Sequence, residues 1–236
     1  MTFRIDVALA AHSFHPDPGV IQGESKHITL VAVVDGMGSW GTGLETAAWT
    51  RAHLAERWRR SVPGTMEAVA GDILAACDAI PAELRDDTFG YGFSGAAVLA
   101  SAGSVEVVAS GQLAVYLVGA AGAVPLFRPR MLVDDLLEKK LLQPAEVEAF
   151  AHQHVCIQPL LADGGQGALV RSGPHEVPVG DAVIVAHWDL MRLLLQQPPA
   201  SWGHRSVLRL QEMGVKAGVP EHPVVSIRRR ETHVAR

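Results

Sequence analysis

The stretch that most constrains this chain is residues 28–43, ITLVAVVDGMGSWGTG, where an uninterrupted apolar run leads into an aspartate and several glycines. A continuous, β-branched run of this kind predicts a strand that is buried on both faces. Asp35 ends the run, and a carboxylate beside a core needs a cation, a donor network or water. The glycines after it let the backbone turn tightly and bring carbonyl oxygens close. This combination suits a hard divalent cation, because Mg²⁺ and Mn²⁺ prefer carboxylate and carbonyl oxygens.

Length, composition and charge exclude several classes of protein. A chain of 236 residues, 48% apolar and 19% charged, can bury one substantial core, and we expect a single domain over residues 1–236. The net charge of −5 argues against a nucleic-acid-binding surface. No apolar stretch has a membrane-spanning length and no signal-peptide pattern opens the chain, so a cytoplasmic protein without membrane contact is expected. Cys77 and Cys156 lie far apart in apolar contexts, which favours buried thiols.

Periodicity and turn residues predict a mixed succession of strands and helices. Strands are expected at residues 3–10, 28–34, 94–101, 105–110, 114–118, 168–172, 182–187 and 224–229. Helices are expected at residues 42–60, 65–80, 132–140, 145–152, 190–196 and 204–213. The three closely spaced strands from residue 94 to residue 118 predict an antiparallel meander. Two antiparallel sheets packed face to face, with a pair of helices on each outer side, would bury all these elements.

The DGMG string after an apolar strand, with a helix beginning near Thr42, resembles the PPM-type, phosphatase 2C-like family of metal-dependent protein phosphatases. The resemblance implies an α+β, four-layer α-β-β-α sandwich, and the order of elements agrees from residue 3 to residue 229. In that family the aspartate bridges two metal ions and the next glycine gives a backbone carbonyl to one of them. The resemblance therefore implies that Asp35 and Gly36 are metal ligands.

The motifs before and after this centre depart from the family pattern. Where the family carries a second acid before the DG, this chain has His15-Pro16-Asp17, and Asp17 is the candidate ligand. The phosphate-binding arginine expected a few residues earlier is replaced by Ala11, His12 and Ser13. Ser94-Gly95-Ala96-Ala97 matches the Ser-Gly-Thr-Thr that opens the central strands.

The later motifs depart further. The family's Gly-Asp-Ser-Arg turn is Ser110-Gly111-Gln112-Leu113 here and lacks an acid. The strand end that normally reads Ser-Asp-Gly-Leu is His187-Trp188-Asp189-Leu190, which moves the acid one place along the chain. A bulge could absorb this slip, whereas a regular strand would aim Asp189 at the opposite face. Glu221 stands near the final acidic motif and completes the predicted metal ligands.

Three functions follow from this pattern. The first is an active Mg²⁺- or Mn²⁺-dependent phosphoserine/phosphothreonine phosphatase, in which metal-bound water attacks phosphorus and His12 or His15 is the catalytic group that protonates the leaving oxygen. The second is a pseudophosphatase or very weak phosphatase of Ser/Thr signalling, which binds a phosphoprotein or protein kinase and holds one weakly bound ion or none. The lost ligand positions favour the second. The third is an unrelated metalloenzyme that uses His12, His15, His152 and His154.

Overall fold

The computed structural model describes residues 3–8, 20–25, 27–37, 40–85, 92–158, 160–161, 169–197, 212–214, 216–217 and 224–229. Its strands are β1 (Phe3–Ala8), β2 (Val20–Glu24), β3 (Ile28–Met37), β4 (Gly92–Ser101), β5 (Ser104–Ser110), β6 (Leu113–Gly119), β7 (Gly122–Phe127), β8 (Leu160–Leu161), β9 (Val170–Glu176), β10 (Ala182–His187) and β11 (Val224–Arg229). Its helices are α1 (Trp40–Arg60), α2 (Met66–Asp78), α3 (Leu132–Glu138) and α4 (Trp188–Leu195), with short 3-10 helices η1 (Ala82–Leu84) and η2 (Pro144–Ala149).

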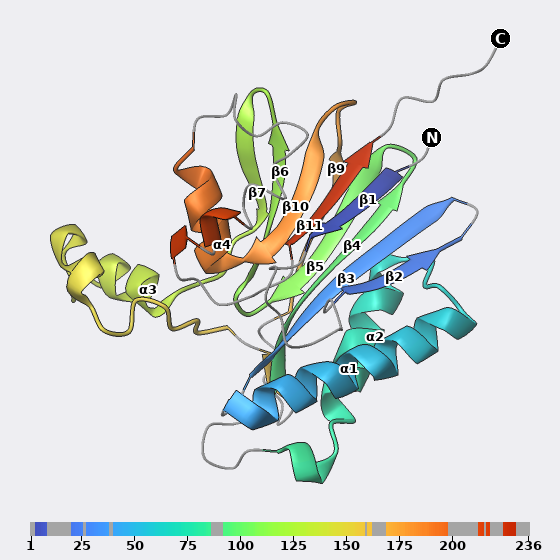
Figure 1. Cartoon of the computed structure of the whole chain (residues 1–236), viewed down its shortest axis with the longest axis horizontal. Coiled ribbons are helices and arrows are strands. Elements are labelled where there is room, and N and C mark those ends of the chain that lie inside the picture. Colours follow the sequence, from blue (N-terminus) through green and yellow to red (C-terminus); the bar gives the residue numbers. More distant parts are fainter. Residues whose placement is uncertain are drawn as a thin grey trace.

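The strands form two antiparallel sheets that face each other, with helices outside both (Figure 1). One sheet has the order β2-β3-β4-β5-β9, with β8 paired to β4, and the other has the order β1-β11-β10-β6-β7. The predicted four-layer α-β-β-α fold is thereby confirmed. The predicted meander is wrong in one respect, because β4 pairs with β5 but β6 belongs to the other sheet. The turn after Ser110 therefore carries the chain from one sheet to the other.

The alternation of side chains along the strands separates the core into layers. On β3, Val31 and Val33 pack between the two sheets, while Leu30, Ala32 and Val34 face the helices α1 and α2. The whole run is buried, as the unbroken apolar pattern predicts. This phase also fixes which way the residues at the end of β3 point.

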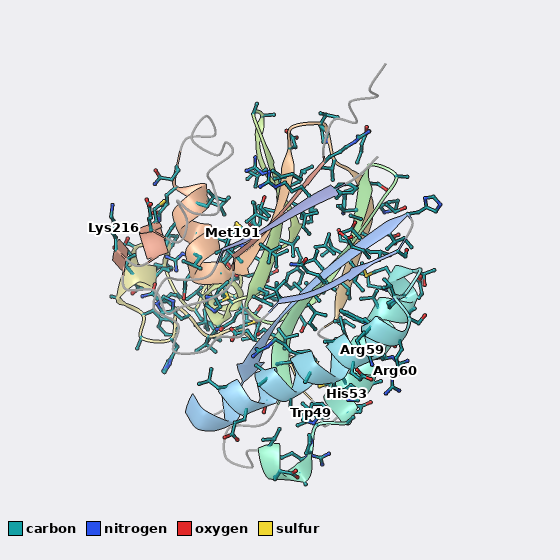
Figure 2. All side chains as sticks on the ribbon, turned by 45° about the vertical axis from the view of Figure 1, so that its right-hand side comes forward. Trp49, His53, Arg59, Arg60, Met191 and Lys216 are labelled. Carbon is teal, nitrogen blue, oxygen red and sulfur yellow. The ribbon has the colours of Figure 1, made fainter. Side chains whose placement is uncertain are left out.

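Helices complete the two outer layers. Leu54 and Trp58 of α1 pack with α2 against the first sheet, and Met191 of α4 packs with Val133 of α3 against the second. Figure 2 shows Met191 and the α1 residue Trp49 on opposite sides of the sandwich. None of the described helices combines the length and the hydropathy that crossing a bilayer requires.

A buried carboxylate joins α1 to α2. Thr65 caps α2 by accepting a hydrogen bond from the backbone N–H of Ala68, 3.3 Å from its Oγ1, as the sequence pattern at this position indicates. Further along α2, the buried Asp72 accepts a hydrogen bond from Trp58 Nε1 at 2.8 Å and another from Arg57 Nε. Because the indole N–H of Trp58 lies in the core, its partner determines whether that burial is favourable.

We expect Asp72→Ala to lower the free energy of unfolding by about 2–3 kcal/mol, because it leaves the buried Trp58 N–H without its acceptor. Urea unfolding followed by tryptophan fluorescence measures this change. Asp78→Ala is the matched control, since Asp78 lies on the same helix but is exposed, and its effect should stay within about 0.5 kcal/mol. Equal effects of the two substitutions would contradict a role of Asp72 in joining the helices.

Candidate active site between the sheet ends

Asp35 and Gly36 lie inside β3 rather than in a turn after it. The strand continues to Met37, with Asp35 opposite Ser94 and Gly36 opposite Phe93 in β4. This corrects the predicted strand end at residue 34. Since Val31 and Val33 face the second sheet, Asp35 faces it as well, and the residue is half-buried. Asp35 therefore lies where the sequence predicts a ligand, between the sheets at the end of a buried strand.

Gly36 faces the other way and permits a close approach of α1. A Cβ on Gly36 would lie 1.6 Å from the carbonyl oxygen of Gly43 and 3.1 Å from the Cβ of Ala47. Only a glycine allows this contact between β3 and the first turns of α1. The close packing fixes the end of β3 that carries Asp35.

The turn between β5 and β6 is hydrogen-bonded to the strand opposite Asp35. The backbone N–H of Gln112 donates to Ser94 Oγ at 3.0 Å, and Ser94 is buried. Gly111, at φ +73°, comes so close to Ser94 that a Cβ would lie 2.1 Å from Ser94 Oγ. The crossing turn and the end of β3 are therefore parts of one rigid region.

The end of β10 reaches the same region from the second sheet. His187 is the last residue of β10, pairs with Leu113 at the start of β6, and is buried. Its Nε2 lies 3.0 Å from Gln112 Oε1, and its Nδ1 accepts from the backbone N–H of Asp189 at 3.3 Å. Asp35 and Asp189 are thus brought to one end of the sandwich, joined through Ser94, Gln112 and His187.

Asp189 is placed by a helix rather than by a bulge. β10 ends at His187 and α4 begins at Trp188, so Asp189 belongs to the first turn of α4, where strand alternation no longer applies. A carboxylate in a first helical turn is favoured by the helix dipole. Neither of the two expected arrangements, a bulge or a regular strand, therefore holds Asp189, because the residue lies in a helix.

Basic groups surround the carboxylate of Asp189. Its Oδ1 lies 3.0 Å from His154 Nδ1 and 3.9 Å from Arg192 Nη1. His187 Nδ1, which accepts from the backbone N–H of Asp189, lies 3.7 Å from Oδ2 and is not a donor to it. Divalent cations are bound by carboxylates that face other oxygen donors, not by carboxylates that face cations and N–H donors. The surroundings of Asp189 therefore favour an ion pair over a metal ligand.

His154 belongs to the stem of a protruding segment, residues 131–156, which we call the flap. Figure 1 shows α3 and the chain after it extending beyond the sheets on the side of α4. The two ends of the flap meet where Leu132 N donates to Val155 O at 2.8 Å, beside the bridge between Met131 and Cys156. Burial raises the pKa of the Cys156 thiol, so this group stays protonated and is a poor metal ligand. The described chain contains no disulfide between Cys77 and Cys156.

Solved structures of bacterial serine/threonine phosphatases have the same arrangement of sheets and helices. The phosphatase PstP/Ppp of Mycobacterium tuberculosis is similar with a TM-score of 0.72 and 19% identity, over 98% of this chain and 100% of its own. The PPM Ser-Thr phosphatase MsPP of Mycobacterium smegmatis, in complex with cacodylate, has a TM-score of 0.67 and 18% identity, over 95% and 97% of the two chains. The catalytic domain of PstP in complex with two manganese ions has a TM-score of 0.67 and 18% identity, over 97% and 99%.

The chain has the PPM phosphatase fold. No protein-family model matches the sequence, and no curated protein is similar enough to it to count as a relative. The PPM fold is thus shared with solved phosphatases whose sequences are 18% or 19% identical to this one.

Within this PPM fold, several predicted site residues lie outside the described residues. They are His12, His15, Asp17 and Glu221. Their predicted roles stay predictions. Among the residues that the structure does describe, no group of three or more histidine, cysteine, aspartate or glutamate side chains is placed to hold a metal ion. Of the predicted ligands the structure describes Asp35, Gly36 and Asp189, and their roles as metal ligands stay predictions.

Trp188 does not occupy the space between the sheets. It is 8% exposed, lies in the outer core between the second sheet and α4, and carries the guanidinium of Arg128 at 5.2 Å from its ring centroid. The sequence analysis named Gln112 and His187 only as departures from family motifs and His154 only as a ligand of an unrelated metal site. It did not predict that tertiary hydrogen bonds join these three residues. The departure of both family motifs at Gln112 and His187 is the one sequence signal that could have linked them.

Proposed function

We propose that this chain is a divergent member of the PPM-type, phosphatase 2C-like family, a pseudophosphatase or very weak phosphatase of Ser/Thr phosphorylation signalling. It acts as one domain over residues 1–236 in the cytoplasm and binds a phosphoprotein or a protein kinase, not nucleic acid or membrane. The observation that supports this most is the environment of Asp189, whose carboxylate contacts His154 and lies close to Arg192. A ligand set weakened in this way disfavours the pair of closely held ions that a two-metal hydrolase needs.

The proposed cofactor is one weakly held Mg²⁺ or Mn²⁺ ion, with Asp35 and the carbonyl of Gly36 as its first ligands and with Asp17 and Glu221 as further oxygen donors. When bound, such an ion supplies a Lewis acid and lowers the pKa of bound water. The chain's own contribution is the rigid end of β3, which holds Asp35 on the face between the sheets.

An active phosphatase is the second candidate. It is favoured by the position of Asp35, which is half-buried between facing sheets in a fold shared with a phosphatase catalytic domain that binds two manganese ions. In that function Asp189 would join the ligands, and His12 or His15 would protonate the leaving oxygen of phosphoserine or phosphothreonine.

Replacement of Asp35 separates these functions. We expect calorimetry to detect weak Mn²⁺ binding to the wild type, and Asp35→Asn to weaken it by roughly tenfold or more because the ion loses an anionic ligand. With an aryl phosphate and Mn²⁺, we expect turnover at or near background. Asp78→Asn is the control, since Asp78 is exposed on α2 and should leave both readings unchanged.

Three results discriminate between the candidate functions. Rapid hydrolysis that depends on Mn²⁺ and disappears in Asp35→Asn would establish the active phosphatase instead. Absence of Mn²⁺ binding by the wild type would exclude the active phosphatase and leave a pseudophosphatase that holds no ion. Tight zinc binding that is lost on replacing His12 or His15 would establish the third, unrelated metalloenzyme.

A further inference from the structure

Gln112 is hydrogen-bonded to three other segments of the chain through all its polar groups. Its backbone N–H donates to Ser94 Oγ at 3.0 Å, and its backbone carbonyl accepts from Trp188 N at 2.8 Å. Its side-chain Nε2 donates to the backbone carbonyl of His154 at 2.8 Å, and its Oε1 lies 3.0 Å from His187 Nε2. One residue thus connects the strand opposite Asp35, through its backbone, with the end of β10 and the stem of the flap, through its side chain.

The chemistry of the amide and imidazole groups determines which atom is the donor in each of these hydrogen bonds. Since the amide Nε2 of Gln112 donates to a carbonyl, its Oε1 is the acceptor, and His187 Nε2 must carry the proton. His187 Nδ1 is then the acceptor for the backbone N–H of Asp189 at 3.3 Å. The neutral imidazole with its proton on Nε2 satisfies both contacts, so Gln112 selects the tautomer of His187.

The same side chain also places the group that Asp189 contacts. Asp189 Oδ1 lies 3.0 Å from His154 Nδ1, while the backbone of His154 is held by Gln112. The side chain of His154 is 57% exposed, so its imidazole stands at the outer end of this network. Gly111 N donates to Gln158 O at 2.8 Å, so the crossing turn also binds the chain just after the flap.

We propose that Gln112 is a positioning residue of the candidate site, which sets Asp189 through His187 and holds the flap stem through His154. This inference rests on the proposed function, because it deepens the account of the same site. An acid at position 112 cannot replace the amide, since a carboxylate would face the carbonyl of His154 without a proton to donate.

Two substitutions separate the two parts of this role. Gln112→Glu keeps an acceptor for His187 but loses the donor to His154, whereas Gln112→Ala loses both. Gln153→Glu is the matched control, because Gln153 Nε2 also donates to a backbone carbonyl of the flap, that of Glu148 at 3.2 Å. Exchange at amides of β3 and β4 reports whether each variant keeps its fold.

Amide hydrogen exchange measures how strongly Gln112 stabilises the hydrogen bonds at the base of the flap. In Gln112→Glu we expect about tenfold faster exchange at three amides at the base of the flap. They are the N–H groups of Gly111, Leu132 and Ile157, which donate to the carbonyls of Gln158, Val155 and Arg130. Nitrogen-15 NMR of His187 should show the Nε2-protonated tautomer in the wild type and a mixture in Gln112→Ala. Gln153→Glu should match the wild type in both measurements. Unchanged exchange in Gln112→Glu, or an unchanged His187 tautomer in Gln112→Ala, would overturn the assignment.

Binding of Mn²⁺ and of a phosphothreonine peptide connects the positioning to the site. We expect Gln112→Ala to bind the peptide about tenfold more weakly than the wild type. Equal affinities would overturn the positioning role and leave the proposed function standing. If the wild type binds neither probe, the proposed function fails, and exchange together with the His187 tautomer still decides the role of Gln112.

Discussion

Gly36→Ala is expected to lower the free energy of unfolding by roughly 4 kcal/mol or more, the range reached when a substitution breaks packing that cannot relax. A Cβ at this position would lie 1.6 Å from the carbonyl oxygen of Gly43, which is a backbone atom and has no rotamer by which to move away. Ala47 Cβ blocks a second direction at 3.1 Å. Relief therefore requires α1 to move off the sheet, which would expose the buried Leu54 and Trp58.

Thermal unfolding followed by circular dichroism measures the effect, together with the soluble yield of the variant. Gly71→Ala is the matched control, because Gly71 lies within α2 and a Cβ there meets no heavy atom within 4 Å. Alanine in a helix interior is favoured over glycine by about 0.5–1 kcal/mol, so this control should be neutral or slightly more stable. A Gly36→Ala protein that melts within about 5 °C of the wild type would show that α1 does not approach β3 this closely.

The helices and central strands of this fold could be predicted from sequence because their signals are local. The apolar run of β3, the helical spacing of α1, and Thr65 at the start of α2 each lie within a few residues. Such signals do not depend on the remainder of the chain. The predicted strand end at residue 34 was wrong, because pairing with β4 continues through Asp35 and Gly36 to Met37.

Other elements depend on contacts that leave no local pattern. β7 contains Pro125, which argues against a strand, yet β7 is an edge strand where the missing N–H is tolerated. η2 begins at Pro144 and forms a 3-10 helix where an α-helix was expected. Turn residues between β5 and β6 indicate a reversal but not which sheet the next strand joins, so the meander was predicted in place of a crossing.

The candidate site was predictable to the same degree. Asp35 follows a buried strand, and its position facing the second sheet follows from the alternation along that strand. Gln112 is separated by 75 positions from His187, so their hydrogen bond has no sequence signature. The family motif marked the turn at residues 110–113 only as one that lacks an acid, whereas the folded chain uses the amide of Gln112 as donor and acceptor together.

Gly111→Ala is expected to lower the free energy of unfolding by roughly 3 kcal/mol or more, because it combines backbone strain with a steric clash. Gly111 has φ +73°, where an alanine costs about 1–2 kcal/mol. Its Cβ would lie 2.1 Å from Ser94 Oγ and 2.8 Å from Ser94 Cα, so rotation of the serine hydroxyl cannot remove the overlap. The substitution would push the crossing turn away from β4.

Urea unfolding can separate the two contributions. Gly180→Ala introduces alanine at φ +94° in the turn before β10, where a Cβ meets nothing within 4 Å, so it measures backbone strain at a nearby φ without a clash. The excess cost of Gly111→Ala over this control is assigned to Ser94. Combining Gly111→Ala with Ser94→Gly should recover part of that excess, since Oγ and Cβ are then gone and only the contact with Cα remains. Additive effects of the two substitutions would contradict a direct contact. Because Gln112 follows Gly111, a direct contact of Gly111 with Ser94 also means that the crossing turn holds Gln112 in place beside Ser94, to which its backbone N–H donates.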